Sequence, residues 1–176
     1  MSTFDAAVLV LRLGVGVIFA VHGAQKLFGW WAGPGFAGWQ GVMARMGFRP
    51  APVFAAISAA AELVGGLALV AGLLTPLAAT ALIGQSLVII FAAHWPRGFF
   101  NRDNGFEFPL ALVSGIAAVL LLGPGAISVD EVIGFAVAPE ARVALIGLGV
   151  LGGIATLAVP RLLPAARDPQ EPAASA

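Results

Sequence analysis

The sequence predicts an all-α integral membrane protein. Its 176 residues are 60% hydrophobic and only 10% charged, whereas a soluble domain carries about 25% charged residues. The mean hydropathy is +0.98. Five apolar segments are long enough to cross about 30 Å of hydrocarbon as helices. We therefore expect a four-helix transmembrane bundle, with two possible parallel helix-pair repeats, followed by a fifth C-terminal transmembrane helix.

The first span runs from about Phe4 to Phe28 and carries a polar stripe. At 100° per residue, Arg12, His22 and Lys26 fall on one face of this helix. An ionisable group at the centre of a membrane helix costs about 2.5–3.5 kcal/mol on insertion scales. The stripe must therefore face protein, water or a ligand rather than lipid.

The later spans contain fewer polar groups. In the second, Glu62 lies near mid-membrane on a face shared with Ser58 and Gly66, and small residues allow close helix packing. In the fifth, Gly149 and Gly153 form a GxxxG pattern that also indicates close packing. We expect these spans at about residues 52–74, 75–95, 107–122 and 141–159.

The segment between the first two spans is not a plain loop. Phe36, Trp39 and Met43 recur there at helical spacing, which predicts a short helix near 35–47 in the headgroup layer.

The tail from Arg167 is polar and rich in Pro and Ala, which is typical of disorder. The predicted organisation is a four-helix domain over 1–135, an additional transmembrane helix over 139–160 and a disordered tail over 167–176.

Two local patterns predict helix starts. Thr75 and Pro76 are suited to the N-cap and first position of the third span, so a very tight hairpin precedes it. Ser128 with Glu131 three residues later forms a capping box. A short surface helix should begin there.

An internal repeat links the two halves of the bundle. The stretch 18–22 (IFAVH) matches 90–94 (IFAAH), and 67–72 matches 110–115. Because the first and third spans cross in the same direction, a duplication would be parallel. His22 and His94 would then lie at matching depth.

Composition excludes several classes of function. Nine basic and nine acidic residues cancel, which leaves no electrostatic footprint for nucleic acid. The absence of cysteine excludes a CxxC relay, a thiolate metal site and disulfides. His22 and His94 could ligate haem or a metal, but a closed zinc site needs four ligands, so we expect no metal site and no haem.

Polar residues gather on one side of the predicted bundle. We call the side where the first helix begins side A and the side where it ends side B. Binding sites in bundles form between helices from apolar walls and a few convergent polar groups. On side B, the candidate catalytic residues are His22, Glu62 and His94, and the candidate cofactor-binding residues are Gln25, Lys26, Trp95, Arg97 and Glu107.

Several of these residues have structural alternatives. Arg12 can pair with Glu62 inside the bundle or reach the side A surface. Lys26 and Arg97 can extend to the headgroups along their apolar stems. His94 can belong to an interfacial aromatic belt. Glu62 has no route to the interface, so it must be neutral, paired or beside water.

The chain resembles the DoxX family in a series of motifs that cover about residues 5 to 131 in order. The matching residues are Arg12, Gly16, Phe19, His22-Gly23-x-x-Lys26-Leu27, Glu62-x-x-Gly65-Gly66, Gly72-Leu73-x-Thr75-Pro76, His94-x-x-x-Gly98-Phe99-Phe100, Gly105-x-Glu107 and Gly123-Pro124-Gly125-x-x-Ser128-x-Asp130. The resemblance implies a small helical membrane protein associated with oxidoreductase systems, including thiosulfate:quinone oxidoreductase and quinol-oxidase-associated subunits. Some mycobacterial relatives act with superoxide dismutase and a sulfurtransferase. The family is mostly described as four-helix, so the fifth helix here departs from it.

The first hypothesis is a quinone-linked oxidoreductase subunit, in which His22 and Lys26, with His94 or Arg97, hydrogen-bond a quinone head group. Glu62 or His22 would relay protons. The alternatives are a non-catalytic anchor for a soluble redox partner and a small proton-coupled transporter. A homo-oligomer is compatible with each hypothesis.

Charge predicts an orientation in a bacterial cytoplasmic membrane. Side A has Arg12 and Arg142, each just within a helix, so the positive-inside rule places side B in the cytoplasm. The N-terminus would then lie outside and the C-terminus inside. The basic residues of side B are Lys26, Arg45, Arg49, Arg97, Arg102, Arg161 and Arg167.

Overall fold

The computed structural model describes residues 2–162, so the predicted tail at 167–176 lies outside the described residues. The described chain folds into α-helices joined by short turns. The α-helices are α1 (Thr3–Phe28), α2 (Gly35–Arg45), α3 (Ala51–Ala71), α4 (Thr75–Ile89), α5 (Glu107–Leu122), α6 (Val129–Ile133) and α7 (Pro139–Leu162). The shorter helical turns are η1 (Trp30–Ala32), the π-helix η2 (Ile90–His94), η3 (Trp95–Arg97) and η4 (Asn101–Asp103).

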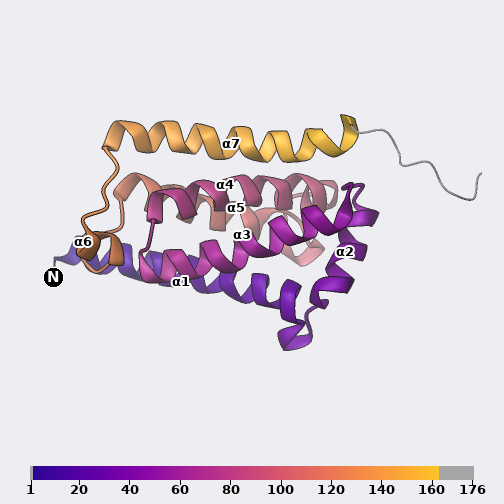
Figure 1. The fold of residues 1–176 in the computed structure, drawn as a ribbon, viewed down its shortest axis with the longest axis horizontal. Helices are drawn as coiled ribbons and strands as arrows, with labels where there is room; N and C mark the ends of the chain where they lie inside the picture. Colours follow the sequence, from indigo (N-terminus) through magenta and orange to yellow (C-terminus); the bar gives the residue numbers. More distant parts are fainter. Residues whose placement is uncertain (1, 163–176) are drawn as a thin grey trace, which may run out of the picture.

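Helices α1, α3, α4 and α5 form a bundle, and α7 packs beside α4 as an additional helix (Figure 1). Helices α1, α4 and α7 run from side A to side B, whereas α3 and α5 return. The short helix α2 crosses the side B end, and α6 lies at side A. The predicted all-α bundle with one extra C-terminal helix is confirmed.

One predicted span has the expected bounds but is shorter than a helix that crosses the hydrocarbon layer. Four helical segments are long and apolar enough to cross a membrane: Thr3–Phe28, Ala51–Ala71, Thr75–Arg97 and Pro139–Val159. Helix α5 has only 16 residues, which corresponds to about 24 Å at 1.5 Å per residue. It ends at Gly123, whose φ of 87° departs from helical geometry. The fourth predicted span is therefore shorter than the hydrocarbon layer is thick.

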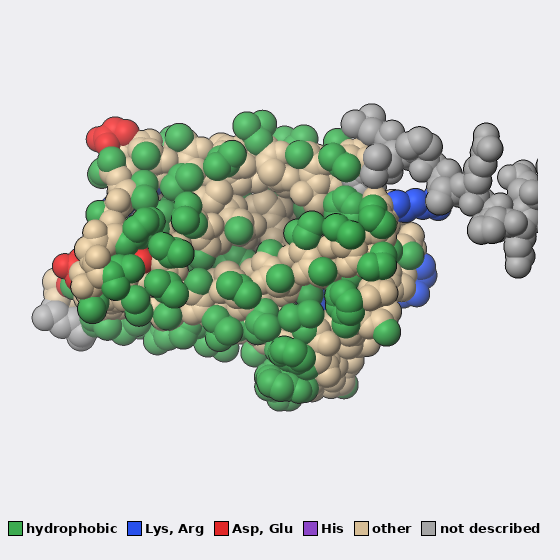
Figure 2. All heavy atoms as spheres, viewed as in Figure 1, with side chains coloured by type: hydrophobic (Ala, Val, Ile, Leu, Met, Phe, Trp, Pro, Cys, Tyr) green, Lys and Arg blue, Asp and Glu red, His purple; other side chains and the backbone are tan. Residues whose placement is uncertain are grey.

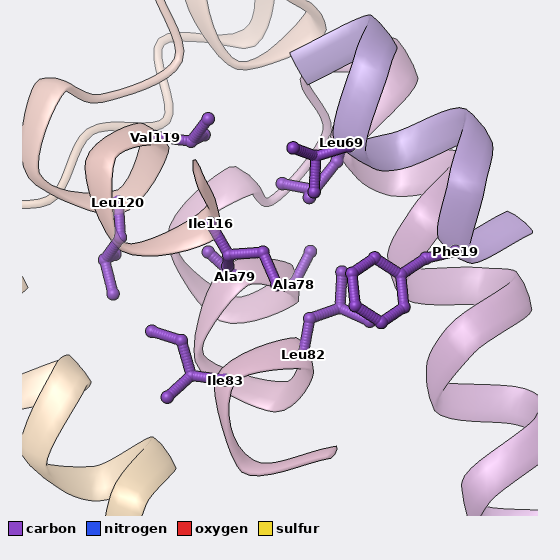
Figure 3. Close-up of a cluster of buried hydrophobic side chains, with 10 residues drawn as sticks. Phe19, Leu69, Ala78, Ala79, Leu82, Ile83, Ile116, Val119 and Leu120 are labelled. Carbon is purple, nitrogen blue, oxygen red and sulfur yellow. The ribbon is translucent and has the colours of Figure 1, made fainter. Parts of the chain in front are cut away.

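The centre of the bundle is an apolar core to which each of its four helices contributes. Phe19 of α1, Leu69 of α3, Leu82 of α4 and Ile116 of α5 point toward one another (Figure 3). All four side chains are at most 3% exposed. Because lipid chains are as apolar as these side chains, close packing rather than the hydrophobic effect stabilises such contacts in a membrane.

Helices α1 and α3 approach closely through glycine. A Cβ placed on Gly16 would lie 2.8 Å from the carbonyl oxygen of Gly66, and Gly66 likewise faces the backbone of Ala20. A side chain at either glycine would push the helices apart. The small-residue face predicted beside Glu62 therefore contacts α1.

The GxxxG pattern of α7 packs against α4. A Cβ on Gly84 would lie 2.9 Å from the carbonyl oxygen of Gly149, and one on Gly153 would lie 2.8 Å from the carbonyl oxygen of Gly84. This confirms that the pattern marks close helix packing. The extra helix is thus attached to the bundle through backbone contact.

Arg12 is buried at side A but does not pair with Glu62. Its Nε donates to the carbonyl oxygen of Leu69 at 3.0 Å and Nη2 donates to that of Val70 at 3.2 Å. Nη1 donates to the carbonyl oxygen of Pro124. The last carbonyls of a helix have no intrahelical partner, so the guanidinium ties the end of α3 to the α5–α6 loop. Of the two alternatives for Arg12, the ion pair with Glu62 is wrong.

The N-terminus of α4 is capped by Asp130 of α6 rather than by Thr75. The Asp130 carboxylate accepts hydrogen bonds from the backbone N–H groups of Leu74, at 2.6 Å, and Thr75, at 2.8 Å. Leu74 occupies the N-cap position with φ of 46°, and Thr75 is already helical. The predicted Thr75 cap is wrong because a carboxylate from another helix satisfies the free N–H groups instead. At Ser128, the predicted cap is present, because its Oγ accepts from Glu131 N at 3.1 Å.

The amphipathic helix predicted near 35–47 is present as α2, but its apolar face packs on protein. Met43 and Phe48 are buried against Ala55 of α3 and Val88 of α4, with Trp39 alongside. Helix α2 therefore closes the side B end of the bundle.

The two ends of the molecule differ in charge. Figure 2 shows Asp and Glu side chains at the side A end, Lys and Arg side chains at the side B end, and hydrophobic side chains over the surface between them. The side A arginines are bound internally: Arg142 donates to the carbonyl oxygens of Val137 and Leu121 at 3.0 and 3.1 Å, and Arg12 is bonded as described. The orientation with side B in the cytoplasm stays a prediction from the positive-inside rule.

Replacing Asp130 should destabilise the protein. We expect Asp130→Ala to lower the free energy of unfolding by about 1–3 kcal/mol, because one buried and one partly buried N–H group lose their acceptor. The neighbouring Glu131 is exposed, so Glu131→Ala is the matched control and should cost less. Unfolding in detergent micelles measures both. Equal losses would contradict the capping role of Asp130.

The orientation can be tested with single cysteines, since the chain has none of its own. Val132, 85% exposed at side A, and Asn101, exposed at side B, can be replaced without changing charge. In intact spheroplasts, a membrane-impermeant maleimide should label Val132→Cys, whereas Asn101→Cys should need permeabilisation. The reverse pattern would overturn the orientation.

Candidate functional site

A charged pair lies inside the side B half of the bundle. Lys26 Nζ of α1 forms a salt bridge with Glu62 Oε1 of α3, and the two side chains are 11% and 1% exposed. The Lys26 ammonium also lies 4.3 Å from the ring centroid of Trp39, which is a cation–π contact. A buried charge without a partner is strongly unfavourable, so each of the two ions makes the burial of the other possible.

Gln85 of α4 and Ser58 of α3 complete the polar network. Gln85 Nε2 donates to Glu62 Oε1 at 2.7 Å and to Ser58 Oγ at 2.8 Å. Glu62 Oε1 therefore accepts from both Lys26 and Gln85. By contrast, Glu62 Oε2 and Trp39 Nε1 are buried and make no hydrogen bond to any described residue. Buried polar atoms are rarely left unpartnered, so one acceptor and one donor remain available here.

This network borders a cavity of about 300 Å³. The cavity lies between α1, α2, α3, the α4–η2 segment and α5, and most of its wall is apolar. Three of its lining residues, His22, Met46 and Phe108, are exposed, so the cavity opens near side B. The apolar part of the wall comes from α1, α2, α4, η2 and α5. It includes Phe19, Met43, Val88, Ala92, Phe108 and Leu112.

Both histidines line the cavity and are held in the same way. His22 Nδ1 lies 2.8 Å from the carbonyl oxygen of Ile18, and His94 Nδ1 lies 2.7 Å from that of Asn104. A carbonyl oxygen can only accept, so Nδ1 carries the hydrogen in each ring. In the neutral imidazole, Nε2 is then an acceptor without a partner among the described residues. His94 belongs to the π-helix η2, a wide turn of a type frequent at functional sites.

Four of the eight predicted site residues meet at this cavity: His22, Lys26, Glu62 and His94. The other four lie at side B outside it. Gln25 Nε2 donates to the carbonyl oxygen of Trp31 at 3.3 Å, and Trp95 stacks on Phe106 with ring centroids 4.9 Å apart. Glu107 Oε2 accepts from the backbone N–H of Asn101 at 2.9 Å, and Arg97 is exposed on η3.

Gln85, Ser58 and Trp39 belong to the site although none was a predicted site residue. A signal in the sequence pointed to two of these three residues. Ser58 shares a helix face with Glu62, and Gln85 is a polar residue within an apolar span. Trp39 gave no such signal, because an aromatic residue on an amphipathic helix is as easily explained by packing or by contact with headgroups.

The comparison with known families settles the resemblance. The DoxX family model matches residues 7–95, about half of the chain. The chain belongs to the DoxX family. The matched stretch is shorter than the predicted 5 to 131, but it includes every polar residue of the network and both histidines.

This DoxX protein is also similar to the "Uncharacterized membrane protein Rv3486" of Mycobacterium tuberculosis. The two are 30% identical over 136 residues, which cover 71% of this chain and 80% of the relative. No solved structure matches the chain. The comparisons thus establish a membrane protein of the DoxX family without assigning it a reaction.

Removing one member of the buried pair should be costly. We expect Glu62→Ala to lower the free energy of unfolding by about 3–5 kcal/mol, because it strands the Lys26 ammonium in the bundle. Glu140→Ala, at an exposed position in the first turn of α7, should have little effect. Thermal and denaturant unfolding in detergent measure both variants.

A double variant tests the pairing itself. Lys26→Met combined with Glu62→Leu removes both charges and should cost less than the sum of the two single changes, because neither partner is left unpaired. Strict additivity would show that the two residues do not stabilise each other.

Proposed function

We propose that this DoxX protein is a quinone-linked membrane oxidoreductase subunit that holds a quinone head group in the side B cavity. The observation that carries the proposal is a single apolar cavity bordered by a buried Lys26–Glu62 pair and by two histidines with free Nε2 atoms.

The size of the cavity supports a small ring. Ligand pockets range from about 300 to 1,000 Å³, so a cavity of about 300 Å³ is at the small end of that range. It suits one substituted ring with its prenyl tail outside. The exposed lining residues His22 and Phe108 lie on α1 and α5, which offers such a tail a path toward lipid.

The polar groups supply what quinone chemistry requires of a protein. Trp39 Nε1 and the remaining N–H groups of Lys26 are donors for a carbonyl oxygen, while Glu62 Oε2 and the Nε2 atoms of the histidines accept protons. Since the chain contains no cysteine, electrons would not pass through a thiol of this protein. A soluble redox partner would supply or remove them.

The proposal predicts saturable binding of a quinone analogue to the purified protein in detergent. His22→Ala and His94→Ala should each weaken binding. The double variant should differ from the sum of the two, because groups that contact one ligand do not act independently. Arg102→Ala is the control, since Arg102 is an exposed cation of side B outside the cavity.

Melting of each variant, followed in parallel, separates loss of the site from loss of the fold. If folded wild-type protein shows no saturable binding, the quinone site is ruled out, which favours the alternative of a non-catalytic anchor for a soluble redox partner. If neither histidine variant weakens binding, the ligand lies elsewhere.

A further inference from the structure

The hydrogen-bonding atoms left free around the cavity include three acceptors. His22 and His94 both donate from Nδ1 to a backbone carbonyl, which leaves each Nε2 as an acceptor. Glu62 adds a third, because Lys26 and Gln85 both bind Oε1 and leave Oε2 without a partner. The site therefore suits a ligand that donates hydrogen bonds.

A quinone and its hydroquinone differ in this property. The quinone ring presents two carbonyl oxygens, which only accept, whereas the hydroquinone presents two hydroxyl groups, which donate. A carbonyl placed beside a neutral Nε2 would bring two acceptors together and leave both unpaired. A hydroxyl placed there would satisfy the ring nitrogen.

The available donors lie together at one place in the cavity wall. Lys26 donates one N–H group to Glu62 and keeps others, and its ammonium lies over the Trp39 ring. Trp39 Nε1 is the one buried N–H group of the described residues that lines the cavity without a partner. Because Lys26 and Trp39 are adjacent, we expect their donors to serve one oxygen of the ligand and the acceptors to face the opposite oxygen.

We propose that the cavity binds the reduced, dihydroxy form of the ring in preference to the oxidised quinone, with His22 Nε2 and His94 Nε2 accepting from its hydroxyl groups. This inference rests on the proposed function. It also changes the role expected of the two histidines, which accept from hydroxyl groups rather than donate to carbonyls.

The test compares three molecules with the same substituted ring: 2,3-dimethoxy-5-methyl-1,4-hydroquinone, the corresponding quinone, and the hydroquinone with both hydroxyl groups methylated. Binding to full-length protein in detergent is measured without oxygen at pH 8, where an ordinary imidazole is neutral. The hydroquinone should bind about tenfold more tightly than either of the others, which corresponds to one hydrogen-bonded pair gained. The methylated ring cannot change redox state, so it separates hydrogen bonding from chemistry.

Substitutions test whether the histidines set the preference. His22→Ala and His94→Ala should each reduce the hydroquinone-to-quinone affinity ratio toward one. His94→Asn should retain part of the ratio, because its Oδ1 can still accept. Arg102→Ala should leave the ratio unchanged, and melting of each variant verifies its fold.

The outcomes separate this inference from the proposed function. Equal or tighter binding of the quinone would overturn the preference while leaving the quinone site intact. A preference that persists in both histidine variants would overturn their role as acceptors. If none of the three molecules binds to folded wild-type protein, both proposals fail.

Discussion

The structure depends on burying the carboxylate of Glu62 inside an apolar bundle. An isolated carboxylate there would be too costly, so the fold brings Lys26 from α1 and Gln85 from α4 to the same oxygen. These contacts require α1 and α3 to approach within backbone contact, which Gly16 and Gly66 permit. Close packing and charge pairing are therefore coupled: a larger residue at either glycine would separate the helices that hold the pair.

A second set of charges fixes the opposite end. At side A, Arg12 binds the last carbonyls of α3, and Asp130 binds the first N–H groups of α4. The tight turn between α3 and α4 is thus held from both sides, by a cation at a helix C-terminus and an anion at a helix N-terminus. With side A fixed by these bonds and the centre filled by the apolar core, the cavity is left at side B.

The cavity is built from the part of the chain that defines the family, together with α5. Residues 7–95 supply the polar network and both histidines, and α5 supplies Phe108, Pro109 and Leu112 as wall. None of the lining residues among the described side chains belongs to α7, which packs on α4 through Gly149 and Gly153. Leu157 of α7 packs against the cluster that contains the lining residues Met43 and Val88.

Segment length, hydropathy and helical period were enough to predict the membrane class, the position of most helices and the concentration of polar residues on side B. The pairing of the charges depends instead on how the helices pack. Arg12 lies opposite Leu69, seven residues beyond Glu62 and about 10 Å farther along α3, and the long α1–α3 connection does not fix that register. The same limit explains why Asp130 rather than Thr75 caps α4, and why Gln85 and Trp39 join the site. Which long side chains on different helices come into contact depends on how the helices cross and rotate. Packing across the whole bundle sets that arrangement, and no local sequence pattern does.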